Sequence, residues 1–111
     1  MDADEFRAIA LALPEAVEQP HFDRPSFRVR KRIFATLHPA EGRAVLKLSR
    51  LAQEALVASD PQTFALTPWA HQGWTSVNLE RVEAAELREL IAEAWAEVAP
   101  KRLAAAFARE H

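Results

Sequence analysis

The sequence predicts a two-layer α+β protein in which an antiparallel sheet is flanked by N- and C-terminal helices. One observation is an apolar stripe at helical spacing from about Glu83 to Val98. A second is a series of short segments between Ser26 and Leu79 that are rich in β-branched and aromatic residues and are separated by turns. Helices placed outside such strands form their own layer and can leave the second face of the sheet open.

The length of 111 residues, half of them hydrophobic, predicts a single domain over residues 1–111 with one core. The absence of cysteine excludes a disulfide framework and a thiolate metal site, and it fits a reducing compartment. No apolar run approaches the roughly 18 residues that cross a bilayer, and Met1 to Ala10 carries three acids where a signal peptide is cationic. We therefore expect a cytoplasmic protein with no membrane partner.

The first helix is expected to begin after Asp2, because Glu5 three positions later completes a capping-box pattern. Its apolar face contains Phe6, Ile9, Ala10 and Leu13. Pro14 ends this helix. The segment Glu15 to Pro25 contains two prolines and is expected to be an extended, stiff connection into the first strand.

Ser26 to Arg30 and Ile33 to Leu37 are predicted to form a β-hairpin around a very polar turn. An even-length turn would divide the apolar side chains between the two faces. An odd-length turn, or a bulge near Arg30 to Arg32, instead collects Phe27, Ile33, Ala35 and Leu37 on one face and places Arg28, Phe34 and Thr36 on the other. We favour the odd register, although the turn has no Gly or Asn for a positive φ.

The alternation of Arg43 to Leu48 predicts a third strand, and Ser49 can cap a short helix to about Ala58. The side chains expected to be buried by this helix are Leu51, Ala55 and Leu56. Phe64 to Leu66 is a candidate for a brief strand, and Trp74 to Leu79 for the last strand. In that last strand, Trp74, Ser76 and Asn78 share one face.

The helix predicted from Glu83 to Val98 is expected to cover the sheet through one stripe, which consists of Leu87, Leu90, Ile91, Ala94, Trp95 and Val98. A partner-binding or dimer surface is the other interpretation of this stripe, but the sheet has no other large cover. Pro100 either breaks the helix or begins a new helical segment. Outside the helices, Trp69 is a candidate for an exposed contact.

Several of these segments resemble the MmcQ/YjbR family. They are His21 to Arg30, Ile33 to His38, Val45 to Leu48, Gly73-Trp74 and Ala99 to Arg102, and the resemblance extends from about Phe6 to Phe107. It implies an α+β fold similar to that of type III secretion chaperones, and members of this bacterial family are commonly labelled DNA-binding. The family has no catalytic signature to carry over. Many relatives have a glycine where this chain has Lys31.

The positive charge is concentrated, since eight of the fourteen Lys and Arg residues lie between Arg24 and Arg50 against one acid, Glu41. The first hypothesis is therefore a DNA- or RNA-binding protein that uses its hairpin and open sheet face. The predicted phosphate contacts are Arg28, Arg30, Lys31, Arg32, Arg43 and Lys47. Phe34 and Trp74 are the predicted stacking platforms. The turn Arg30 to Arg32 is also a candidate for a separate wing that reaches a groove of the nucleic acid.

Two other interpretations stay open. The basic residues are equally suited to keeping strand edges soluble, with Phe34 and Trp74 packed under the C-terminal segment. Alternatively, the protein is an interaction or chaperone-like domain whose sheet receives a peptide or a second copy, so monomer and homodimer are both compatible with the sequence.

Enzymatic and metal chemistry find little support in the sequence. Its four histidines share no short ligand spacing, and its two glycines cannot form a glycine-rich phosphate loop. Its serines lack a nucleophile-elbow context. We expect neither catalysis nor a metal or cofactor.

Overall fold

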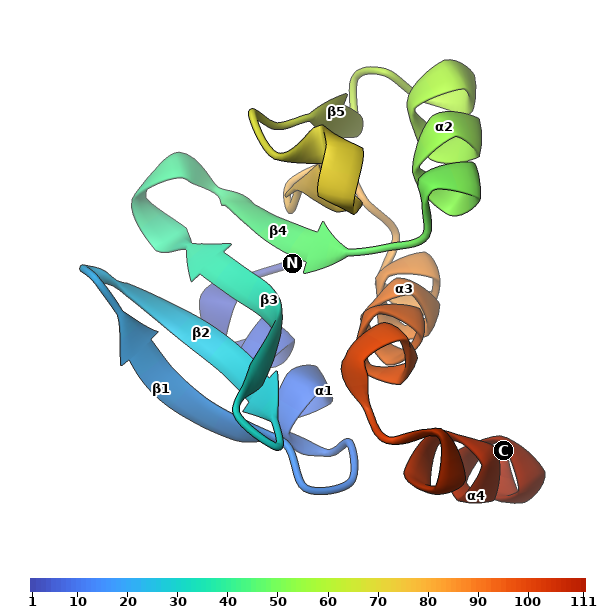
Figure 1. Cartoon of the computed structure of the whole chain (residues 1–111). Coiled ribbons are helices and arrows are strands. Elements are labelled where there is room, and N and C mark those ends of the chain that lie inside the picture. The colour runs from blue at the N-terminus through green and yellow to red at the C-terminus, as the bar shows by residue number, and fades with distance from the viewer.

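The computed structural model describes all 111 residues (Figure 1). It forms one six-stranded sheet with the strand order β1-β2-β3-β4-β6-β5. Every neighbouring pair of strands is antiparallel. The strands are β1 (Val17–His21), β2 (Arg24–Val29), β3 (Arg32–His38), β4 (Arg43–Lys47), β5 (Phe64–Leu66) and β6 (Trp74–Asn78). The helices are α1 (Ala3–Leu11), α2 (Arg50–Ser59), α3 (Ala84–Val98) and α4 (Lys101–Glu110), with short 3-10 turns at Pro39–Glu41 and Ala70–Gln72. The predicted α+β class is confirmed.

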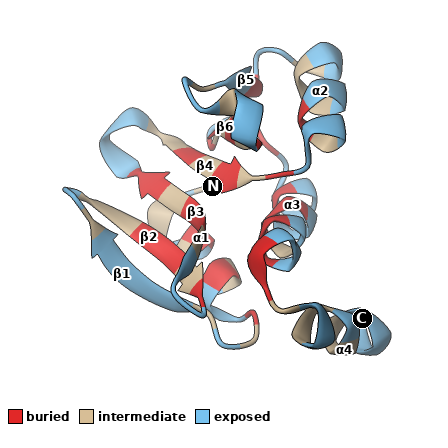
Figure 2. Ribbon diagram, in the orientation of Figure 1, coloured by how far each residue is buried: buried red, intermediate tan, exposed pale blue.

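Helices α1 and α3 cover one face of the sheet. Helix α3 packs on β2, β3 and β4 and touches α1, and the apolar core of 22 residues lies in this contact. Figure 2 shows the buried residues gathered on the central strands and α3, whereas β1 and α4 carry none. The whole predicted stripe of α3 is buried, and the indole of Trp95 donates a hydrogen bond to the Pro14 carbonyl at 2.9 Å. None of the helices is long and apolar enough to span a membrane.

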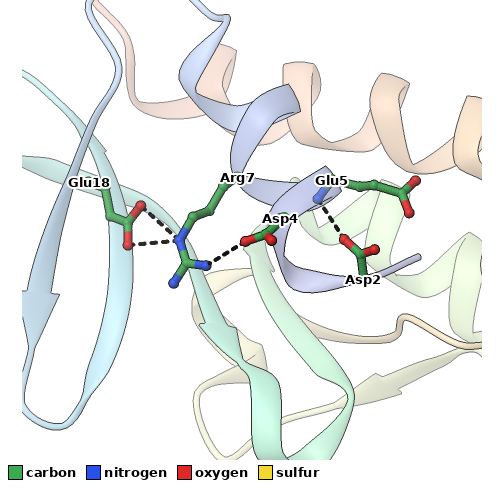
Figure 3. A network of polar contacts seen from close by, with 5 residues as sticks. All are labelled: Asp2, Asp4, Glu5, Arg7 and Glu18. Carbon is green, nitrogen blue, oxygen red and sulfur yellow. Dashed lines mark hydrogen bonds and ion pairs between the residues drawn. The ribbon is translucent and has the colours of Figure 1, made fainter.

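The start of α1 follows its capping signal, since the Asp2 carboxylate accepts from the Glu5 backbone N–H at 2.8 Å (Figure 3). Arg7 then ties this helix to the first strand. Its Nε donates to both carboxylate oxygens of Glu18, at 3.0 and 3.1 Å. Together with Asp4 at 3.4 Å, these residues close a small network on the surface between α1 and β1.

The connection expected to be extended from Glu15 to Pro25 contains a strand that was not predicted. Residues Val17 to His21 form the edge strand β1, which pairs with β2 in a register where Pro20 lies opposite Pro25. An edge strand tolerates proline because one side of its backbone needs no partner in the sheet. All five side chains are exposed or only partly buried, so no alternation marks the strand in the sequence.

The β2–β3 hairpin does not have the expected odd-length turn. Val29 pairs with Arg32, which leaves a two-residue turn in which Arg30 and Lys31 have φ values of 51° and 71°. Positive φ at both central residues is the type I′ geometry, which Asn-Gly usually occupies. The register shifts farther along, because Phe27 pairs with Ala35 and Arg28 pairs with Ile33. The bulge is thus inside the strands rather than near Arg30 to Arg32.

This bulge reverses two predicted orientations. Phe34 was expected on the open face but is fully buried in the core beside Ala35. Ile33 was expected in the core but lies opposite Arg28 on the open face. The physical reason is that a bulge leaves one residue without a cross-strand partner and lets two successive side chains point to the same side. Phe34 therefore cannot act as a stacking platform.

Helix α2 begins as predicted but buries a different face. The hydroxyl of Ser49 accepts from the Ala52 backbone N–H at 3.1 Å. Leu51, expected in the core, is 79% exposed, and Ala55 is exposed as well. The buried residue is Gln53, whose amide donates to Thr75 Oγ1 at 3.1 Å and to the Trp74 carbonyl at 3.3 Å. The helix packs at the β5 end of the sheet, where Ala52, Leu56 and Val57 are partly buried against the core.

Replacing Phe34 with alanine should lower the free energy of unfolding by about 3–5 kcal/mol, because a large side chain is removed from a closed core. The matched control is Ile33→Ala, since the neighbouring side chain borders solvent and should cost about 1 kcal/mol. Urea unfolding of both variants measures the difference. Equal losses would contradict the position of Phe34 in the core.

Candidate binding site on the open sheet face

The sheet face opposite α1 and α3 carries a groove of about 690 Å³. Its floor is formed by side chains from β3, β4 and β6, namely Ile33, Thr36, Val45, Trp74 and Ser76. One wall is the β1–β2 turn, from which His21, Phe22 and Arg24 line the groove. The other wall is formed by Leu66 at the end of β5 and by the connection from β5 to β6, which includes Trp69. Since β1–β2 and β5–β6 lie at opposite edges of the sheet, the groove runs across the strands.

The pairing of the strands explains why the floor is hollow. Thr36 pairs with Val45, and Val45 pairs with Ser76, so short side chains form one row across the centre of the open face. Larger groups lie in the rows on either side. One row contains His38, Arg43 and Asn78, and the other contains Lys47 and Trp74. A central row of short residues between taller rows leaves a trough.

Aromatic rings stand at both walls and on the floor. Phe22 is 91% exposed and Trp69 is 60% exposed, whereas Trp74 is partly buried in the floor. Trp74 is the first residue of β6. The preceding Gly73 has a φ of 94° and sets the direction in which the chain enters this strand. A Cβ at Gly73 would lie 2.0 Å from the Leu48 carbonyl oxygen, so only glycine fits there.

Phe22 occupies an unusual backbone position. His21 pairs with Arg24, so Phe22 and Asp23 form a two-residue hairpin turn. Phe22 has a φ of 60°, while Asp23 is not among the residues of positive φ. Positive φ at the first central residue is the type II′ pattern, which favours glycine. Holding a bulky residue in this region costs about 1–3 kcal/mol, and such strain concentrates at functional sites.

Three predicted cations, Arg28, Arg43 and Lys47, lie on the open face as expected. Arg28 Nε donates to Ser26 Oγ at 3.1 Å, and Arg43 Nε donates to Glu41 at 2.9 Å. Lys47 Nζ donates to the Gln72 carbonyl and lies 5.9 Å from the centre of the Trp74 ring, within cation–π range. The position of Trp74 on this face was also predicted correctly. Arg24, at the groove wall, was not among the predicted site residues.

The tip of the β2–β3 hairpin carries less free positive charge than its three consecutive cations suggest. The guanidinium of Arg30 binds Glu15 through two hydrogen bonds, of 2.5 and 3.0 Å. The hydrogen bond from Arg30 holds the pKa of the Glu15 carboxyl below its usual value. Lys31 and Arg32 are exposed and form no ion pair. Two of the three tip cations are therefore free to meet an anion.

His38 is a feature of the site that its sequence position did not reveal. The side chain is almost fully buried at the end of the groove, and its Nε2 lies 3.0 Å from Thr36 Oγ1. Burial, with Arg43 and Arg24 nearby, lowers the pKa of His38 from its ordinary value of 6.5. These surroundings favour the neutral imidazole. No group of three or more His, Asp or Glu side chains gathers in a geometry that could hold a metal ion.

No Asp or Glu lines the groove. Its lining combines three aromatic rings, two arginines and two histidines with hydroxyl and aliphatic groups. The alternation of side chains in β2, β4 and β6 indicated that Trp74 and the cations lie on the open face. It did not indicate Phe22, because that residue lies in a turn where no periodicity operates.

The fold and this face define a small α+β protein with one covered and one open sheet surface. The chain belongs to the YjbR family, whose sequence profile matches residues 11–97. It is also similar to the crystal structure of Deinococcus radiodurans protein DR2400, which has a DUF419 domain. The identity is 26%, the TM-score is 0.80, and the match covers 87% of this chain and 78% of that one. No curated protein matches the chain.

The buried His38 predicts a loss of stability in mild acid. Because the folded-state pKa lies below that of the unfolded state, the unfolded chain takes up the proton first as the pH falls. The contribution of the neutral imidazole to the free energy of unfolding is therefore fully present above about pH 6.5 and declines below it. Thermal unfolding from about pH 7.5 to about pH 5.5 should show a smaller decline for His38→Gln than for the wild type. An identical decline in both would contradict this role of His38.

Proposed function

We propose that this protein binds nucleic acid through the open face of its sheet, in a binding rather than a catalytic role. The observation that carries the proposal is the groove, which has exposed aromatic rings and cations but no carboxylate in its lining. Phosphates are attracted to Lys and Arg, and the flat faces of bases stack on aromatic rings.

The cations extend beyond the groove along one side of the protein. Arg24 and Arg43 line the groove, Arg28 and Lys47 lie on the same face, and Lys31 protrudes at the hairpin tip. A nucleic-acid backbone lying across β2, β3 and β4 would pass all of these positions. Because Arg43 is already paired with Glu41 and Arg24 with Asp23, we expect these two arginines to contribute less than the other cations.

The opposite layer carries the reverse charge. Helix α3 exposes Glu86, Glu89, Glu93 and Glu97. Partial burial of its carboxyl raises the pKa of Glu93, and the negative charges of Glu89 and Glu97 raise it further. Since α3 covers the other face of the sheet, a polyanion is repelled from the helices and attracted to the strands. The charge distribution thus favours one side for binding.

A protein ligand is the second candidate, and the exposure of Phe22, Leu66 and Trp69 favours it. These three large apolar side chains stand at the groove walls, where they would meet side chains of a bound peptide. The absence of carboxylates in the groove would then select an acidic peptide. Such binding would not require a base to stack on.

Titration of fluorescent DNA and RNA oligonucleotides at several salt concentrations tests the proposal. We expect dissociation constants of about 1–100 μM that rise steeply with salt. In the double variant Arg28→Ala, Lys47→Ala, the slope of log K against log salt should become shallower by about 0.7–0.9 per lost phosphate contact. The variant Lys31→Ala, Arg32→Ala measures the hairpin tip separately.

The matched control is Arg88→Ala, Arg102→Ala, which removes the same charge from the helical layer. It should leave binding almost unchanged. Equal weakening by all double variants would indicate attraction by net charge alone. Absence of binding at low salt would exclude the proposed function.

A further inference from the structure

We propose that the groove holds an unpaired segment of a single strand, DNA or RNA, with a base stacked on the ring of Phe22. This inference rests on the proposed function and specifies its ligand. Phe22 is the most exposed large hydrophobic side chain in the protein and projects from the groove wall formed by the β1–β2 turn. Its ring is therefore available to a ligand that enters from solvent.

The backbone at Phe22 gives an independent reason to assign it a role in binding. Its φ of 60° places a bulky residue where glycine is favoured in a two-residue hairpin turn. The ring gains little packing in return, since its one aromatic neighbour is the His21 imidazole, with ring centroids 4.7 Å apart. A strained and solvent-exposed aromatic residue does not serve the stability of the fold. Its place at the groove wall instead suits contact with a ligand.

The arrangement of aromatic rings selects single strands over duplexes. Bases in a duplex are stacked on one another and present only their edges in the grooves, so their faces cannot meet Phe22, Trp69 or Trp74. Reading a duplex usually requires a helix placed in the major groove. In this protein α1 and α3 lie on the other side of the sheet from the groove. The open face therefore offers stacking surfaces and no recognition helix.

The groove is also of the appropriate size and chemistry for a short segment. Its volume of about 690 Å³ lies within the range of roughly 300–1,000 Å³ typical of pockets for compact ligands. Ser76 on the floor is partly buried, and its hydroxyl makes no hydrogen bond within the protein. A base edge or a sugar hydroxyl can therefore bind there. Arg24 stands on the same wall as Phe22, and although its Nε lies 3.5 Å from Asp23 Oδ1, its exposed guanidinium can still meet the phosphate of the stacked nucleotide.

The test compares Phe22→Gly, Phe22→Leu and the wild type with single-stranded and duplex oligonucleotides of the same sequence, as DNA and as RNA. The wild type should bind single strands at least about tenfold more tightly than the duplex. Phe22→Gly should lose at least about fivefold in single-strand affinity, which corresponds to the loss of one stacked base. Phe22→Leu should lose nearly as much, because leucine is apolar but has no flat ring.

Folding can be separated from binding in this experiment. Glycine relieves the positive φ at this position, so Phe22→Gly should melt at or above the wild-type temperature while it binds more weakly. Leu51→Ala is the matched control, because it removes another exposed large side chain from outside the groove. It should not change affinity. If Phe22→Gly were to melt lower, Trp69→Leu on the opposite wall would give a second measure of stacking.

The outcomes distinguish this inference from the proposed function. Equal affinity for duplex and single strand, with Phe22→Gly unchanged, would overturn the inference and leave nucleic-acid binding intact. Full retention of affinity by Phe22→Leu would indicate apolar contact rather than stacking and would also overturn it. No binding of either form at low salt would overturn both, and binding of an acidic peptide in its place would support the second candidate function.

Discussion

The bulge at Phe34 is the constraint on which the two faces of the sheet depend. The two-residue turn at Arg30 and Lys31 imposes an even register, in which Leu37 would face solvent and Thr36 would enter the core. The bulge shifts the register once within β3. Before the bulge the side chains are placed as in the even register, with Ile33 on the open face and Phe34 in the core. After the bulge they are placed as in the odd register, with Ala35 and Leu37 in the core. Leu37 therefore packs in the core. Thr36 lies on the open face, where its short side chain helps to leave the centre of the groove hollow.

The sequence was sufficient to predict elements whose side chains alternate between solvent and core, such as α3, β4 and β6. The sequence was insufficient for elements whose side chains do not alternate between solvent and core. Strand β1 is exposed along its length, and α2 buries Gln53 through hydrogen bonds instead of Leu51. The apolar pattern of the hairpin indicated an odd-length turn or a bulge near Arg30 to Arg32, but it did not locate the shift inside the strands.

The candidate site was predicted in part for the same reason. Alternation placed Arg28, Arg43, Lys47 and Trp74 on one face, but it could not reveal that Arg30 in the β2–β3 turn pairs with Glu15, which lies between α1 and β1. Charge counted along the chain overstates the charge available at the surface, since neighbours in space neutralise part of it. Phe22 and Trp69 lie in connections, where only the closing of the sheet brings them to one groove.

The distribution of the three tryptophans gives the molecule separate optical reporters. Trp95 is enclosed in the core and hydrogen-bonded to Pro14, whereas Trp69 and Trp74 border the groove. Emission from Trp95 therefore responds to the integrity of the fold, and emission from the other two responds to what occupies the open face. Folding and occupancy can thus be followed in one unlabelled chain, provided that one class of indole is replaced at a time.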